Sequence, residues 1–353
     1  MSFVGGRLYS ESMPSRAAVP PGLPSLGLPS LDELLANAHV VSLPMRVKFR
    51  GIMARESLLL RGPAGWGEFG PFPEYDDAEA SRWLASAVEA GWHGFPAPLR
   101  SVIPVNATVP AVSADRVPEV LARFGRVDAV KVKVAESGQT LHDDAARLAA
   151  VRSLLPDAAI RVDANGGWDV PTAVSALTRL AAVGLEYAEQ PVPTIEGLAE
   201  VRSQLRAAGT PVLIAADESV RKESDPLRVA RAGAADLIVV KVAPLGGVRR
   251  ALDIVGQAGL PAVVSSALDT SMGIRAGLAL AASLPELPYA CGLGTVSLFE
   301  SDITLDPLVA DDGAIRLRDV SADTGLLERY AAPAERRDWW LGRLRRVHAF
   351  LAR

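Results

Sequence analysis

Cysteine is nearly absent from this 353-residue sequence, which contains only Cys291. One cysteine cannot form a disulfide within the chain, so we expect a reducing compartment, the cytoplasm. Cys291 lies in an apolar stretch, which favours a packing role over a nucleophilic one. With 49% hydrophobic residues, the chain can instead bury a large core.

Excess positive charge and long apolar runs are also missing. The formal net charge is −4 and the pI is about 5.7, so nothing favours binding to nucleic acid or to an anionic membrane. No apolar run approaches the roughly 18 residues of a membrane-spanning helix. The first residues have no apolar core and include Glu11, so we expect no secretory signal.

Proline is concentrated at the start of the chain, at Pro14, Pro20, Pro21, Pro24 and Pro29. Such a composition is typical of an extended segment with few contacts. We therefore predict that residues 1–33 form a disordered arm outside the fold.

Short runs rich in β-branched residues recur through the middle of the chain, separated by Ala-, Leu- and Arg-rich stretches with helical spacing. A strand followed by a helix, repeated regularly, is typical of a parallel sheet. Eight such strands favour a closed (β/α)8 TIM barrel over residues 101–300. A doubly wound open sheet is less favoured, since no G-x-G-x-x-G follows the first strand. The expected strands are 103–110, 129–135, 159–165, 184–191, 211–219, 237–244, 260–268 and 289–295.

Both ends of the chain outside the barrel have a different pattern. Residues 38–70 predict a small antiparallel meander, followed by a helix near 77–90, and residues 314–319 predict a further edge strand. We expect a discontinuous α+β capping domain, built from 34–100 and 301–353 and packed against one mouth of the barrel.

Charged residues stand at the C-terminal ends of five consecutive expected strands, where barrel enzymes carry their chemistry. The second strand ends with Lys133 and the sixth with Lys241. Between them, three acids end the third, fourth and fifth strands, and carboxylates together with water suit Mg²⁺. Lys131, two residues before Lys133, points to the same face. The three expected metal ligands are Asp163, Glu189 and Asp217.

Simpler interpretations exist for each of these residues taken alone. A single acid at a strand end is often a helix cap or an ion-pair partner, and a single lysine can be a salt-bridge partner. Three buried like charges, however, are unfavourable unless a cation offsets them. None of the four histidines, His39, His93, His142 and His348, lies at an expected strand end. A histidine base and a multi-histidine zinc site are therefore not expected.

Taken together, these motifs resemble the enolase superfamily. The resemblance is carried by Lys131-Val132-Lys133, Asp163-Ala164-Asn165, Glu189-Gln190-Pro191, Asp217-Glu218-Ser219 and Lys241. Lysines on the second and sixth strands are similar to the muconate-lactonizing subgroup. The mandelate-racemase subgroup would need a histidine on the seventh strand, which here ends in Ser265-Ser266-Ala267.

The resemblance implies a mechanism. Lys133 would remove a proton next to a substrate carboxylate and then, as an acid, assist the departure of hydroxide. Lys241 would stabilise the enediolate from the opposite face, and one Mg²⁺ would act on the developing charge as a Lewis acid. The substrate would be a small carboxylate, in contact with Lys131, Arg161, Asn165, Ser265 and Ser266.

Three functions are compatible with this pattern. Loop stretches at 49–56, 65–77, 240–247 and 263–274 are similar to the branch of the subgroup that dehydrates a cyclohexadiene carboxylate to 2-succinylbenzoate, a carbon–oxygen lyase. An N-acylamino acid racemase or dipeptide epimerase would use the same two lysines, each as a base on one face. A non-catalytic barrel is the third possibility, and it gives no reason for five charged residues at one mouth. The sequence does not define the oligomeric state.

Overall fold

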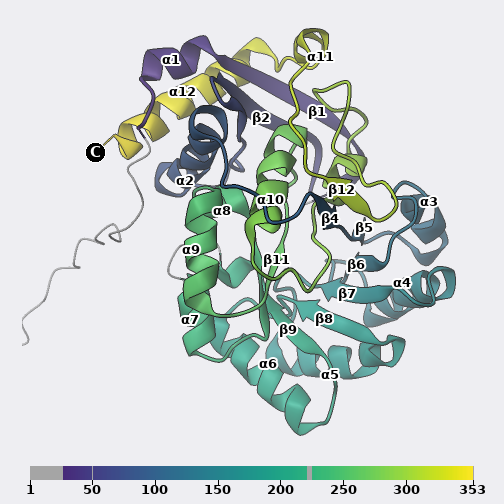
Figure 1. Cartoon of the computed structure of the whole chain (residues 1–353). Coiled ribbons are helices and arrows are strands. Elements are labelled where there is room, and N and C mark those ends of the chain that lie inside the picture. Colours follow the sequence, from purple (N-terminus) through teal and green to yellow (C-terminus); the bar gives the residue numbers. More distant parts are fainter. Residues whose placement is uncertain (1–26, 50, 221–224, 353) are drawn as a thin grey trace, which may run out of the picture.

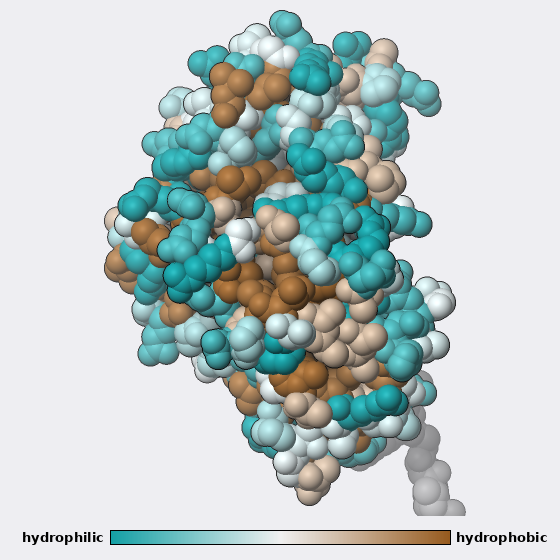
Figure 2. Space-filling view, turned by 90° about the vertical axis from the view of Figure 1, so that its right-hand side faces the viewer, coloured by the Kyte–Doolittle hydropathy of each residue, from teal (hydrophilic) through white to brown (hydrophobic). Residues whose placement is uncertain are grey.

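The computed structural model describes residues 27–49, 51–220 and 225–352. Two units built from these residues share one hydrophobic core, which runs from Leu34 and Leu84 in the cap to Val130 and Val264 in the barrel. No helix of the described part is long and apolar enough to cross a membrane. On the face drawn in Figure 2, hydrophilic side chains cover most of the surface and hydrophobic ones gather towards the middle.

The cap begins with an antiparallel sheet in the order β1-β2-β3, as predicted. Its strands are β1 (Ala38–Phe49), β2 (Ile52–Gly62) and β3 (Gly65–Phe69). Helix α2 (Asp77–Val88) follows, capped by the Asp76 side chain, and continues into the π-helical turn η1 (Glu89–His93). A Cβ on Gly67 would lie 2.0 Å from the Ala87 carbonyl oxygen, so glycine allows the close approach of β3 to α2.

The barrel is a parallel sheet in the order β11-β10-β9-β8-β7-β6-β5. Cys291 bridges to Val105 on one side, and Gly292 bridges to Ser265 on the other, so residues 291–292 close the sheet. The strands are β5 (Ala107–Val109), β6 (Ala129–Lys133), β7 (Ala159–Asp163), β8 (Leu185–Glu189), β9 (Leu213–Ala216), β10 (Leu237–Val240) and β11 (Ala262–Val264).

The predicted barrel is confirmed, but its eighth strand is reduced to these two bridges. The stretch from Cys291 contains Gly292 and Gly294, and it turns directly into a 3-10 helix, η5 (Gly294–Leu298). Glycine favours such a turn over an extended strand. The eighth position is therefore occupied by a short closing segment.

Helices surround the sheet (Figure 1). The main helices are α4 (Leu141–Leu154), α5 (Val170–Leu180), α6 (Ile195–Ala207), α7 (Asp225–Arg231), α9 (Val248–Ala258) and α10 (Ser271–Ser283), with the shorter α3 (Val117–Leu121) and α8 (Val242–Leu245). Thr140 and Asp143 form a capping box at the start of α4. The side chains of Asp169, Thr194 and Thr270 cap α5, α6 and α10, as is usual for these residue types.

The C-terminal segment returns to the cap through a helix. Strand β12 (Ala314–Arg316) is present but pairs with β4 (Val102–Pro104) ahead of the barrel, and not with the cap sheet. After α11 (Thr324–Arg329), helix α12 (Ala334–Leu351) runs beside α1 (Leu31–Ala36) and α2 (Figure 1). The Trp340 indole N–H donates to Glu56 of β2 at 2.9 Å. The expected edge strand at 314–319 is thus shorter than predicted and does not belong to the cap sheet.

The predicted N-terminal arm is wrong at its C-terminal end. Residues 1–26 lie outside the described residues, but 27–33 belong to the fold. Helix α1 (Leu31–Ala36) starts at the N-cap Ser30 and buries Leu34. Glu33 accepts a hydrogen bond from the Trp92 indole at 2.6 Å. Ser30 caps α1 and Leu34 packs into the core. These two contacts order the helix although the residues before it are rich in proline.

Candidate active site

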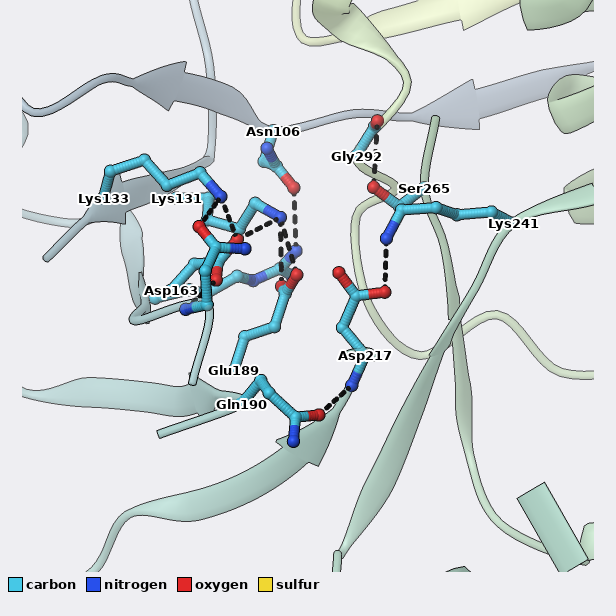
Figure 3. A network of polar contacts seen from close by, with 12 residues as sticks. Asn106, Lys131, Lys133, Asp163, Glu189, Gln190, Asp217, Lys241, Ser265 and Gly292 are labelled. Atoms are coloured by element: carbon cyan, nitrogen blue, oxygen red, sulfur yellow. Dashed lines mark hydrogen bonds and ion pairs between the residues drawn. The ribbon is translucent and has the colours of Figure 1, made fainter. Parts of the chain in front are cut away.

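The five predicted charged residues converge at the C-terminal end of the barrel (Figure 3). Lys133, Asp163 and Glu189 are the last residues of β6, β7 and β8, and they lie opposite one another in the register of the parallel sheet. Asp217 directly follows β9, and Lys241 directly follows β10. Residues in register on neighbouring parallel strands share one face of the sheet. These side chains point together into the barrel (Figure 3).

Lys131 is a buried counter-charge for two of the acids. Its ammonium donates to the Glu189 carboxylate at 2.9 and 3.0 Å and lies 3.2 Å from Asp163 Oδ2, with the residue only 8% exposed. Burial alone would lower the pKa of Lys131, but Glu189 and Asp163 raise it well above its ordinary value. Lys131 is therefore held in its charged form.

Lys133 lies between an acid and an amide. Its ammonium donates to Asp163 Oδ2 at 2.5 Å and to Asn165 Oδ1 at 2.7 Å. Asn165 has a left-handed backbone, with φ of 47°, and its side-chain amide donates to Glu218. Burial opposes ionisation of Asp163, but the ammonium groups of Lys133 and Lys131 lower its pKa well below the usual range. Asp163 is therefore an ionised partner of both lysines.

Lys241 approaches from the opposite side of the barrel mouth (Figure 3) and donates to Asp217. Gln190 fixes the backbone beneath this pair: its side-chain carbonyl accepts from the N–H groups of Asp217 and Ser219 at 2.9 and 3.1 Å. Gln190 is fully buried. The sequence predicted no role for Gln190, although a glutamine at the end of a buried strand is a signal for side-chain hydrogen bonds to the neighbouring backbone.

A small cavity of about 50 Å³ lies between the two lysines. Its volume has room for one or two water molecules or a single carboxylate. Of the predicted site residues, Lys131, Lys133, Asp163, Asn165, Asp217, Lys241, Ser265 and Ser266 line it. Further lining residues, for which the sequence predicted no role, include Thr108, Glu218, Leu268, Gly292 and Thr295.

Family models match both units of this architecture. A model described as Enolase C-terminal domain-like matches residues 113–326, and one described as Enolase N-terminal domain-like matches residues 40–91. The chain belongs to the enolase superfamily.

Curated relatives define the branch of the superfamily. The o-succinylbenzoate synthase of Mycolicibacterium smegmatis is 56% identical over 326 residues, which cover 92% of this chain and 99% of the relative. The o-succinylbenzoate synthase of Mycobacterium tuberculosis H37Rv is 53% identical over 325 residues, covering 92% and 97%. These relatives confirm the predicted dehydratase branch and do not favour the racemase alternative.

A solved structure supports the fold. The muconate cycloisomerase of Pseudomonas fluorescens aligns with a TM-score of 0.69 at 21% identity, covering 84% of this chain and 98% of that protein. The predicted enolase-like TIM barrel with a capping domain is therefore confirmed.

Arg161 is separated from the rest of the predicted enolase-superfamily site. It points into the barrel, but two residues below Asp163 along β7. Its guanidinium donates to Glu186 at 2.6 Å and to the Ala290 carbonyl at 2.6 Å, and it lies over the Tyr187 ring. It does not line the cavity between the lysines. The resemblance implied a substrate contact for Arg161, which its depth in the barrel does not support. The alternation of side chains along β7 predicts the direction of Arg161 but not its depth.

The histidines and Cys291 lie away from this superfamily site, as expected. His39 is on β1, His93 in η1, His142 on α4 and His348 on α12. Cys291 is buried, and burial raises the pKa of its thiol to about 12. A buried, protonated thiol fits the predicted packing role of Cys291.

The three acids have the chemistry of a magnesium site. Across the described residues, no three Asp, Glu, His or Cys side chains could hold a metal ion in their present arrangement. Each of the three carboxylates is instead in contact with a lysine ammonium group. The donor set nevertheless fits a hard divalent cation, since Asp163, Glu189 and Asp217 are buried carboxylates at the ends of neighbouring strands. Burial and the Asp163 carboxylate raise the pKa of Glu189, a sign that this cluster favours additional positive charge.

Proposed function

We propose that this chain is an o-succinylbenzoate synthase. It dehydrates 2-succinyl-6-hydroxy-2,4-cyclohexadiene-1-carboxylate to 2-succinylbenzoate, a step of menaquinone biosynthesis. The proposal depends most on one observation: Lys133 and Lys241 face one cavity from opposite sides, with three acids between them. The name shared by relatives at 53–56% identity supports the same reaction. We also propose a cytoplasmic location, for which the single cysteine remains the reason.

Lys133 is the proposed base and acid. As a neutral amine, it takes the proton from the ring carbon that carries the carboxylate, and the electron pair of that C–H bond moves towards the carboxylate. The resulting ammonium then donates a proton to the departing hydroxyl, so the C–O bond breaks and water leaves. Asp163 and Asn165 hold the Lys133 amine in place through this cycle.

Lys241 and Lys131 have electrostatic roles in this proposal. Lys241 remains an ammonium on the opposite face and offsets the negative charge that develops after proton removal. Lys131 stays charged and balances Glu189 and Asp163 from below. Ser265 and Ser266 line the remaining wall, where Ser266 Oγ pairs with Thr295 Oγ1 at 2.6 Å and Ser265 Oγ donates to the Gly292 carbonyl at 3.4 Å.

Asp163, Glu189 and Asp217 would hold one Mg²⁺. When bound, the ion would supply Lewis-acid stabilisation to the carboxylate of the substrate.

The experiment is an assay of purified protein with Mg²⁺ and the cyclohexadiene precursor, in which the appearance of 2-succinylbenzoate is followed. A parallel reaction in D₂O contains N-succinyl amino acids and reports deuterium exchange at the α-carbon. We expect dehydration to be the efficient reaction. Efficient exchange without dehydration would replace this proposal with a racemase.

A further inference from the structure

A second, larger cavity opens beside the catalytic one. It measures about 500 Å³ and shares two lining residues, Lys133 and Asn165, with the cavity between the lysines. The inner cavity of about 50 Å³ is too small for the whole substrate, since small-molecule sites usually measure about 300–1,000 Å³. The arm of a substrate whose ring reacts between Lys133 and Lys241 must therefore extend out of it, and the outer cavity adjoins it at Lys133.

The outer cavity has an excess of positive charge. Of the described residues that line it, four are cationic, Arg46, Lys48, Arg116 and Lys133, and one is acidic, Glu136. Arg116 lies 3.3 Å from Glu119, and Lys133 is paired with Asp163. The remaining two cations, Arg46 and Lys48, both come from strand β1 of the cap.

Neither Arg46 nor Lys48 has an acidic partner among the residues that the structure describes. The guanidinium of Arg46 donates to the carbonyl oxygens of Phe299 and Glu300 at 2.8 and 3.0 Å, and these acceptors orient it without neutralising it. Lys48 is exposed and makes no hydrogen bond or ion pair with another residue of the described part. A cavity with two unneutralised cations attracts anions.

Strand β1 is anchored next to these cations. Met45 pairs with Phe299 in an isolated bridge, and the Glu300 N–H donates to the Pro44 carbonyl at 3.0 Å. These contacts join β1 to residues 299–300, which follow η5. The backbone that carries Arg46 and Lys48 is therefore held beside the outer cavity, which both residues line.

We propose that Lys48, with Arg46, forms a subsite for the terminal carboxylate of the succinyl arm, an inference that rests on the proposed function. The substrate then carries two carboxylates, one on the reacting ring and one at the end of the arm. The ring carboxylate belongs to the inner cavity with the acids and lysines. The arm leads outward, past Met53 and Val112, which also line the outer cavity, and the subsite selects dicarboxylates.

Ligand binding to the Mg²⁺-loaded protein tests this subsite without requiring turnover. The probes are the product, 2-succinylbenzoate, and 2-butyrylbenzoate, in which a methyl group replaces the terminal carboxylate. The wild-type protein should bind the dicarboxylate more tightly. Lys48→Gln should reduce this preference about threefold to fivefold, the range of an exposed ion pair. Lys48→Arg should retain the preference, and the exposed Arg345→Gln on α12 is the matched control for loss of one positive charge.

Steady-state kinetics give a second readout. Lys48→Gln should raise KM about threefold to fivefold with kcat within about twofold, because the subsite contributes to ground state and transition state alike. A preference that is unchanged in both Lys48→Gln and the Lys48→Gln/Arg46→Gln double variant would overturn the subsite. Failure of the proposed function is distinct: the wild-type protein would bind both probes but would not dehydrate the precursor.

Discussion

At the scale of single residues, Lys131 and Lys133 lie two positions apart on β6 but have different surroundings. Lys131 contacts the carboxylates of Asp163 and Glu189. Among the described residues, Lys133 contacts the Asp163 carboxylate and the Asn165 amide, and it lines both cavities. The alternation of a strand predicted that both lysines face the barrel interior. It could not predict which carboxylates they would meet, because Glu189 lies 58 residues from Lys131 in the chain.

Lys133→Arg should abolish dehydration. Arginine keeps the positive charge but stays protonated at any working pH, so the variant has no base at this position. We expect kcat to fall by about 10²–10⁴-fold, the usual contribution of a general base. Near-normal kcat in a folded variant would mean that another group removes the proton.

Lys241→Arg should be less severe for dehydration. The cation remains on the opposite face, although with a different shape and reach. We expect measurable dehydration, about tenfold to a hundredfold slower, while deuterium exchange into one enantiomer of an N-succinyl amino acid disappears. If Lys241→Arg were as inactive as Lys133→Arg, the purely electrostatic role of Lys241 would be wrong.

At the scale of elements, the cap is joined to the barrel by a buried acidic residue. Glu68 on β3 accepts hydrogen bonds from Thr270 Oγ1 at 2.7 Å and from the Gly273 N–H at 3.0 Å, at the start of α10. Arg55 on β2 donates to the Leu268 carbonyl at 3.0 Å. The hydrophobic pattern predicted the strands, but such contacts between residues some 200 positions apart have no local signal.

Glu68→Gln should change the pH dependence of stability. Burial, with repulsion from Asp269, raises the pKa of Glu68 to about 8. The folded chain then keeps a proton that the unfolded chain releases above about pH 4.3, so the free energy of unfolding falls as the pH rises from there to about 8. Glutamine does not titrate. Over this pH range, the free energy of unfolding of Glu68→Gln should therefore fall by about 1–3 kcal/mol less than that of the wild type.

Urea unfolding at several pH values measures the effect, with the exposed Glu335→Gln variant as the control. An identical slope in Glu68→Gln and wild type would show that Glu68 does not hold the proton.

Helix α1 packs on the core through Leu34. Leu34 is fully buried, whereas the neighbouring Leu35 is only partly buried. Leu34→Ala should therefore lower the free energy of unfolding by about 2–3 kcal/mol through lost packing. The matched Leu35→Ala should cost less than about 1 kcal/mol. Equal effects in a urea titration would mean that α1 does not dock as the structure describes.

At the scale of the whole molecule, regular strand–helix alternation predicted the barrel, and the change of pattern before residue 101 predicted the cap. The closing segment at 291–292 was not predictable as two bridges, because an apolar run with glycines also fits a short strand. The docking of α1 was missed because nearby prolines dominated the composition. The convergence of the five charged residues could be predicted, since parallel strands bring their C-terminal residues to one mouth whatever the helices between them contain, whereas the roles of these residues stay predictions.

A metal titration tests whether this mouth forms one magnesium-dependent dehydration site. Metal-stripped protein is given the cyclohexadiene precursor, and the formation of 2-succinylbenzoate is followed as Mg²⁺ is added. We expect no turnover in excess chelator, full recovery with one Mg²⁺ per chain, and no recovery in Asp163→Ala, Glu189→Ala or Asp217→Ala. Full activity in excess chelator would mean that dehydration does not need the metal.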